Sequence, residues 1–270
     1  GPMLLLGTIY FAIQIYCDFS GYSDMAIGLA LMLGFHFPDN FTRPYGALGF
    51  SDFWRRWHMT LSRFLRDYLY FSLGGNRKGR ARRYLNLFLT MAIGGLWHGA
   101  AWTFVFWGAM HGVMLIINHG WRAVWTKPIN TWWSHGLARS FTFLCIALAW
   151  VFFRAPDTQA ALSIYRGLIA WTPDVMSTAL VSDLLWFSFW MGIVWFLPNT
   201  QQWLARVHPA FDFTSRELRA DPLLIPISAC SWRHFLAWRP GCIQATIIGL
   251  TTAASLLSLQ HVSEFLYFQF

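Results

Sequence analysis

The histidine at position 98 is the side chain of this chain best suited to proton transfer. His98 lies in the apolar run 84–118, in which no Lys, Arg, Asp or Glu occurs between Asn86 and Asn118. An imidazole in an apolar span loses hydration, so it is retained there when it is paired or does chemistry. Its ordinary pKa of about 6.5 makes it a proton acceptor near neutral pH. Two roles remain open: a general base for a hydroxyl or thiol that attacks an acyl group, or a hydrogen-bonding residue between helices.

A second histidine, His111, lies in the same run, and each histidine is followed by glycine. The two imidazoles could line one cavity, particularly if the helix between them is broken at Gly94, Gly95 and Gly99. These glycines would also let a substrate chain approach the backbone closely. For His111 a packing or interhelical role is favoured over a chemical one.

A polar block, 17–24, interrupts the first apolar segment and contains Asp18, Ser20 and Asp24. Polar groups at membrane depth are tolerated where they line a wet cavity or are buried in protein. A carboxylate at that depth is costly and is a functional hypothesis by default. Asp18 and Ser20 therefore lie either at the bilayer interface or in an internal cavity, where Asp18 would orient a histidine.

The segment Arg43–Arg83 contains ten basic and two acidic residues, so its charge of +8 equals the net charge of the whole chain. The positive-inside rule places such a loop on the cytoplasmic side of the membrane. Ser51 and Asp52 are predicted to cap an amphipathic, interfacial helix that continues to Phe71. Four arginines occupy its polar face, and they would bind either the phosphates of a cytosolic donor or anionic lipid headgroups: Arg55, Arg56, Arg63 and Arg66.

The composition predicts an all-α, polytopic integral membrane protein. Hydrophobic residues make up 56% of the 270 residues and charged residues 12%, against about 25% in soluble domains. So apolar a chain argues against nucleic-acid binding as the purpose of the basic segment. We expect about five to seven membrane helices plus interfacial amphipathic helices, with candidate segments at 3–16, 25–37, 84–96, 100–118, 141–153, 184–197 and 243–259 and a short interfacial helix at 158–171.

Residues 1–2 resemble a cloning scar, and 3–270 are expected to form a single membrane domain. No cysteine and histidine spacing typical of a metal site is present, so no metal is predicted. Cys230 and Cys242 could form a disulfide if the loop 198–241 is extracytoplasmic.

Four blocks of the sequence, in order, resemble the membrane-bound O-acyltransferase family, in its bacterial branch that O-acetylates alginate and other polysaccharides. The blocks are CDFSGYSDMAIGLALMLGF (17–35), SDFWRRWHMTLSRFLRDYLYFSLGGNRKG (51–79), GGLWHGAAWTFVFWGAMHG (94–112) and SEFLYFQF (263–270). The resemblance aligns His98, in its Trp-His-Gly motif, with the family's invariant histidine. It aligns Asp18-Phe19-Ser20 with the family's Asp-Phe-Ser motif, and His111 less closely with a second histidine.

The resemblance implies a membrane acyltransferase of the bacterial inner membrane that uses acetyl-CoA as donor and no metal. It also implies a periplasmic SGNH or serine-esterase-like partner and a polysaccharide acceptor. Family members carry further spans ahead of the polar block, so the chain resembles the C-terminal part of the family fold. Two other functions stay open: a non-catalytic scaffold for an acetylation complex, and a proton-coupled transporter that uses His98 and Asp18 as a relay.

Overall fold

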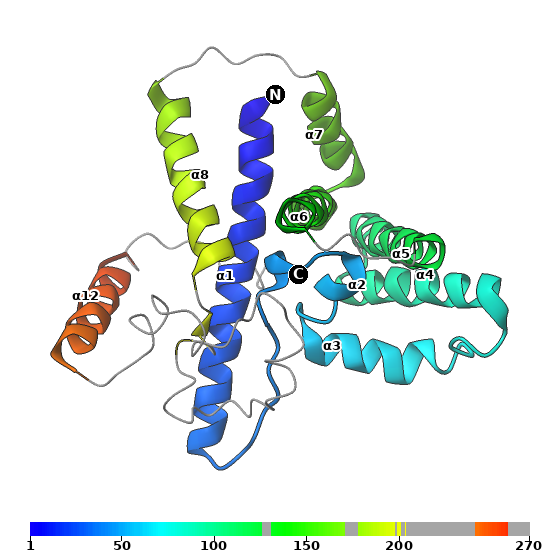
Figure 1. The fold of residues 1–270 in the computed structure, drawn as a ribbon, viewed down its shortest axis with the longest axis horizontal. Helices are drawn as coiled ribbons and strands as arrows, with labels where there is room; N and C mark the ends of the chain where they lie inside the picture. The colour runs from blue at the N-terminus through cyan, green and yellow to red at the C-terminus, as the bar shows by residue number, and fades with distance from the viewer. Residues whose placement is uncertain (126–130, 171–177, 198, 201–202, 204–240, 259–270) are drawn as a thin grey trace. The chain divides into compact units, whose positions relative to one another are not determined.

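A computed structural model describes residues 1–125, 131–170, 178–197, 199–200, 203 and 241–258 of the chain. Every regular element of these residues is helical, as the sequence predicts (Figure 1). The α-helices are α1 (Pro2–Met32), α2 (Phe50–Phe53), α3 (Met59–Phe64), α4 (Gly79–His98), α5 (Trp102–Val124), α6 (Trp132–Arg154), α7 (Thr158–Ala170), α8 (Thr178–Phe196) and α12 (Cys242–Ser258), with a 3₁₀ turn at Pro44–Gly46 and a π-helical segment at Leu65–Tyr70.

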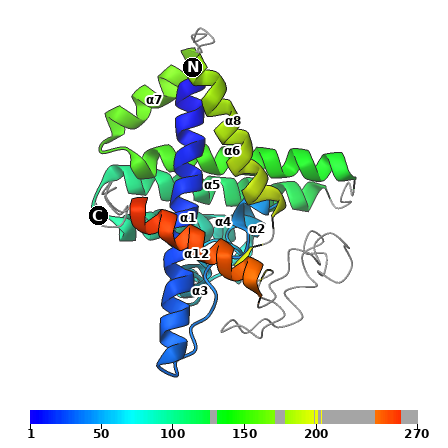
Figure 2. The ribbon, with the colours of Figure 1, turned by 90° about the vertical axis from the view of Figure 1, so that its left-hand side faces the viewer.

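The chain divides into two compact units, one of residues 1–23 and 40–196 and one of residues 24–39 and 197–270. The first unit holds the candidate site. Within it α5 runs alongside α4 and α6 (Figure 2). In the second unit the backbone after α1 turns at Gly34, which has a φ of 81°, and the Phe35 amide donates to the Ala30 carbonyl at 2.9 Å. The segment 198–241, with Cys230, lies almost wholly outside the described residues, as does 263–270.

Two described helices, α1 and α6, are long and apolar enough to cross a membrane. The shorter apolar stretches 181–196 and 242–257 correspond to two further predicted segments. By length and composition these helices agree with a membrane protein, and the figure of five to seven spans stays a prediction.

The polar block 17–24 does not break the first helix, contrary to the expectation of two separate apolar segments. α1 is continuous from Pro2 to Met32. A helix satisfies its own backbone hydrogen bonds, so polar side chains alone need not end it. The block thus lies on the surface of one helix, with Ser23 buried and Asp18 exposed.

The prediction of one continuous amphipathic helix from Ser51 onward is wrong. α2 ends at Phe53, and His58 takes a left-handed conformation with a φ of 43° before α3 begins. The reason lies in the loop before α2, because the Met59 amide donates to the Asn40 carbonyl at 3.0 Å instead of continuing a helix. Asp52 caps no long helix; its carboxylate accepts from the Leu48 amide and from Arg56.

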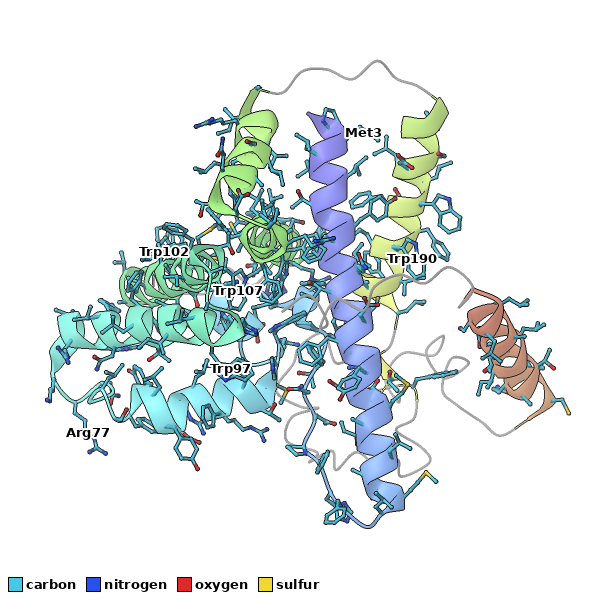
Figure 3. All side chains as sticks on the ribbon, turned by 180° about the vertical axis from the view of Figure 1, so that it is seen from behind. Met3, Arg77, Trp97, Trp102, Trp107 and Trp190 are labelled. Atoms are coloured by element: carbon cyan, nitrogen blue, oxygen red, sulfur yellow. The ribbon has the colours of Figure 1, made fainter. Side chains whose placement is uncertain are left out.

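The run 84–118 forms a helical hairpin of α4 and α5, which turns directly after His98. The two helices approach so closely that a Cβ on Gly95 would lie 2.2 Å from the Phe104 carbonyl oxygen, and one on Gly108 would lie 2.2 Å from the Met91 carbonyl oxygen. Only glycine permits this approach. The hairpin therefore fixes His98 at the tip of α4, at the opposite end from Arg77 (Figure 3).

Candidate active site

His98 lies at the last residue of α4 in a half-buried aromatic setting. Its ring contacts Trp107 and Phe153, each with ring centroids 5.2 Å apart in edge-to-face geometry. Trp107 comes from α5 and Phe153 from α6, so three helices define the position of the imidazole. No polar group of the described residues hydrogen-bonds to His98, which leaves its nitrogens available to a substrate.

His58 is the neighbour that sequence reasoning missed. It lies in the linker between α2 and α3, and His98 acts on it electrostatically. Its ring packs edge-on against Phe19 of the polar block, with centroids 4.8 Å apart. Burial, and then the proximity of His98, lower the pKa of His58 to about 4, so the imidazole is neutral near pH 7.

Asn40 fixes the orientation and the tautomer of His58. Its side-chain oxygen accepts from the Thr60 amide at 3.3 Å and from the Thr60 hydroxyl at 2.9 Å. The same oxygen lies 3.1 Å from His58 Nδ1. Because an amide oxygen can only accept, His58 Nδ1 carries the proton and Nε2 keeps its lone pair. The neutral imidazole is thus held with an acceptor nitrogen free.

The polar block of α1 reaches this assembly through two residues. The Asn40 amide nitrogen donates to the Ser23 hydroxyl at 3.4 Å, and Phe19 contacts the His58 ring. Asp18 is exposed and hydrogen-bonded to Gln14 one turn earlier, and Ser20 is half-buried. The block therefore joins His58 by way of Ser23 and Phe19, and among the described residues no hydrogen bond or ion pair links Asp18 to a histidine.

His111 occupies a different environment on α5. Its side chain is 0% exposed, and neither ring nitrogen has a hydrogen-bond partner within the described part of the chain. Aromatic rings surround it, with Trp107 at 4.8 Å and Trp54 at 5.1 Å between centroids. Trp107 thus touches both histidines of the run, His98 on one side and His111 on the other.

The four arginines of the predicted donor site divide into two kinds. Arg56 is bound to Asp52 at 2.9 Å, and Arg66 to Asp67 at 2.7 and 3.1 Å. Arg55 and Arg63 are exposed, and neither forms an ion pair with a described residue. The π-helical segment that follows α3 carries Arg66, so the four guanidiniums do not share one helix face.

No group of three or more His, Cys, Asp or Glu side chains among the described residues could hold a metal ion. The signal for His58 was present in the sequence, in the block 51–79, but nothing local links it to Asn40 or to His98.

Residues 3–155, which include His58, His98 and His111, match the membrane-bound O-acyltransferase family. The chain is 40% identical over 267 residues to the probable alginate O-acetylase AlgI of Pseudomonas putida, which covers 98% of this chain and 53% of that protein. It is 49% identical over 167 residues to the probable alginate O-acetylase AlgI of Pseudomonas aeruginosa, covering 61% of this chain and 31% of that protein.

A third relative is the peptidoglycan O-acetyltransferase of Helicobacter pylori, 48% identical over 162 residues, which cover 60% of this chain and 31% of that protein. The chain belongs to the membrane-bound O-acyltransferase family. It spans about half the length of the curated relatives that it matches along nearly all of its own length.

Proposed function

We propose that this chain carries the reaction centre of a membrane O-acyltransferase, which moves an acetyl group from a cytosolic donor toward an exopolysaccharide. The observation that carries the proposal is the half-buried His98 at the tip of α4, placed by rings of α5 and α6, together with His58, which Asn40 holds in one neutral tautomer. Family membership and relatives named for alginate and peptidoglycan O-acetylation support the reaction class and a polysaccharide acceptor.

In the proposed step His98 acts as general base. It removes the proton of the acceptor hydroxyl while that oxygen attacks the thioester carbonyl carbon. The new C–O bond forms, the C–S bond breaks, and the donor leaves as a thiolate that takes the proton back from the histidine. Aromatic rings around His98 exclude water, which limits hydrolysis of the thioester.

The other residues of the assembly have supporting roles. His58 offers its free Nε2 as a second acceptor beside His98. His111 is assigned to the same centre through the shared ring of Trp107, as a residue that holds that ring in place. Asp18 and Ser20 form the polar surface of α1 next to Phe19.

Donor and partner follow from the same family. Acetyl-CoA is the proposed donor, and it reaches the site from the cytoplasmic side, where Arg43–Arg83 would lie. Arg55, Arg56, Arg63 and Arg66 are the proposed contacts for its phosphates. The proposed route continues to a periplasmic serine-esterase-like protein, across the bacterial inner membrane.

The test is acetyl transfer from radiolabelled acetyl-CoA to polymer in membranes that hold the full assembly. His98→Ala is expected to lower the rate by roughly 100-fold or more, which is the contribution of a positioned base. His58→Ala is expected to lower it as well, whereas His36→Ala, at an exposed position, serves as the matched control. Normal transfer by His98→Ala would overturn the assignment and favour the scaffold function.

A further inference from the structure

A second group of basic side chains gathers at the other end of the α4–α5 hairpin. Arg83 lies in the second turn of α4, while His119 and Arg122 lie in the last two turns of α5. Arg55 follows α2, which packs on α5. The Ser51 amide donates to the Asn118 side-chain oxygen at 3.2 Å and ties the start of α2 to this end of α5. Three elements that are distant in sequence thus meet here.

His119 is at the centre of this group. Arg83 Nη2 lies 2.9 Å from His119 Nδ1. Because a guanidinium can only donate, His119 accepts at Nδ1, and its neutral ring carries the proton on Nε2. The charges of Arg83, Arg122 and Arg55 all act on this imidazole. Three positive charges therefore surround one neutral ring that still has a free N–H donor.

No acidic side chain of the described residues forms an ion pair with Arg55, Arg83 or Arg122. The carboxylate closest in sequence, Asp52, is already engaged by Arg56 and by the Leu48 amide. Like charges held together without a counter-ion repel one another. Elsewhere in the same segment arginines do have acidic partners, as at Arg66 and Asp67. The group at this end of the hairpin therefore carries positive charge that no carboxylate of the described residues offsets.

The adjoining surface is apolar and aromatic. Trp121 and Trp125 stack with centroids 5.5 Å apart and interplanar angle 6°, and Val124 is 83% exposed. Exposed tryptophans next to arginines are typical of the level at which lipid headgroups lie. The basic group and this aromatic surface therefore occupy the same end of the hairpin.

We propose that Arg55, Arg83, His119 and Arg122 form a phosphate-binding site. Guanidinium groups bind phosphate oxygens in bidentate fashion, and the His119 Nε2–H supplies a further donor. The phosphate belongs either to an anionic lipid headgroup or to a soluble phosphorylated ligand. The site shares Arg55 with the donor contacts proposed above, but it is argued from the charge and geometry of the hairpin end and does not need the transfer reaction.

The test uses the full chain purified in a neutral detergent. Binding of dioctanoyl-phosphatidylglycerol and of adenosine 3′,5′-bisphosphate is measured by calorimetry, with dioctanoyl-phosphatidylcholine as the zwitterionic reference. The variant Arg55→Gln/Arg122→Gln changes two exposed residues, so folding is expected to be retained. The matched control, Arg77→Gln/Arg80→Gln, removes the same charge from two exposed positions near the start of α4.

The expected result is a loss of affinity of about tenfold in the Arg55/Arg122 variant and less than about twofold in the control. Selective loss for phosphatidylglycerol identifies a lipid site, and selective loss for the bisphosphate identifies a site for a soluble ligand. Equal losses of affinity in both variants would show that binding depends on net charge alone and would overturn the proposal. Failure of the unaltered chain to bind either probe would overturn it as well. Arg83→Lys keeps the charge, and its expected intermediate affinity reports the bidentate geometry.

Discussion

His98 and His111 lie in the same apolar run, each is followed by a glycine, and both contact Trp107. The fold nevertheless gives them opposite environments. His98 ends α4, is half-buried and lies beside His58. His111 is in the middle of α5, fully enclosed by aromatic rings and without a hydrogen-bond partner in the described residues. A helix end exposes a side chain and frees the backbone around it, whereas mid-helix positions pack on three sides. We infer from this comparison that access and polar neighbours, beyond a place in an apolar run, favour His98 over His111 as the reactive histidine.

The largest expected effect comes from removing the buried ring of His111. His111→Ala removes a fully buried ring and should lower the free energy of unfolding by roughly 3 kcal/mol, because the surrounding rings cannot fill the cavity. His111→Phe keeps the volume and removes two unpartnered nitrogens, so near-normal stability and transfer are expected. Thermal unfolding in detergent and acetyl transfer measure both. Loss of transfer by a stable His111→Phe protein would show that the imidazole itself takes part in the reaction.

A slightly smaller effect is expected at the contact that positions both histidines. Gly95→Ala would put a Cβ against the backbone of α5, and separating the helices should cost about 2 kcal/mol. Transfer should fall too, because His98 follows three residues later. Gly136→Ala on α6 is the matched control: a Cβ there meets nothing within 4 Å, and the change should raise helix stability slightly. A Gly95→Ala protein that melts like the unaltered chain would contradict the close approach of α4 and α5.

A third prediction concerns Asn40, the residue that orients His58. Asn40→Ala removes the acceptor that orients His58, and we expect transfer to fall by roughly tenfold, or about 1.4 kcal/mol. Asn40→Asp keeps an acceptor oxygen and should restore part of the rate. Thr60→Val removes one donor to the same oxygen and should have a smaller effect. If Asn40→Ala left the rate unchanged while His58→Ala abolished it, orientation by Asn40 would be unnecessary.

The smallest expected effect concerns pH. Burial and His98 lower the pKa of His58 from 6.5 in the unfolded chain to about 4 in the fold. A depressed pKa means that the unfolded state binds the proton more readily, so this contribution to stability is present above about pH 6.5 and is lost as the pH falls toward 4. The melting temperature of the unaltered chain should decline across that window, and His58→Gln should flatten the decline. An equally steep decline in His58→Gln would assign it to other groups.

The motifs around His98 and His111 and the helical content could be predicted from the sequence, whereas the apolar run 84–118 by itself fits either one long helix or two broken ones. The motifs and the helical content depend on local features, namely long apolar runs, a polar block and paired glycines. The break at His58 could not be predicted, because amphipathic spacing from Ser51 onward favours a continuous helix. The carbonyl and side chain of Asn40, which is distant in sequence, take the Met59 and Thr60 donors instead. The continuity of α1 through the block 17–24 could not be predicted either, because a polar block in an apolar run occurs both on a continuous helix and where the backbone leaves one.

By itself the sequence determined the class of protein, the family, the helices and the reactive candidate at position 98. These follow from hydropathy and from motifs, which are sums over neighbours along the chain. The tertiary structure alone decided that Asn40 holds His58 beside His98, that His111 is sealed among aromatic rings, and that Arg55 joins Arg83, His119 and Arg122. Burial, tautomer and charge compensation depend on groups brought together from separate helices, and no local pattern encodes which group will face which.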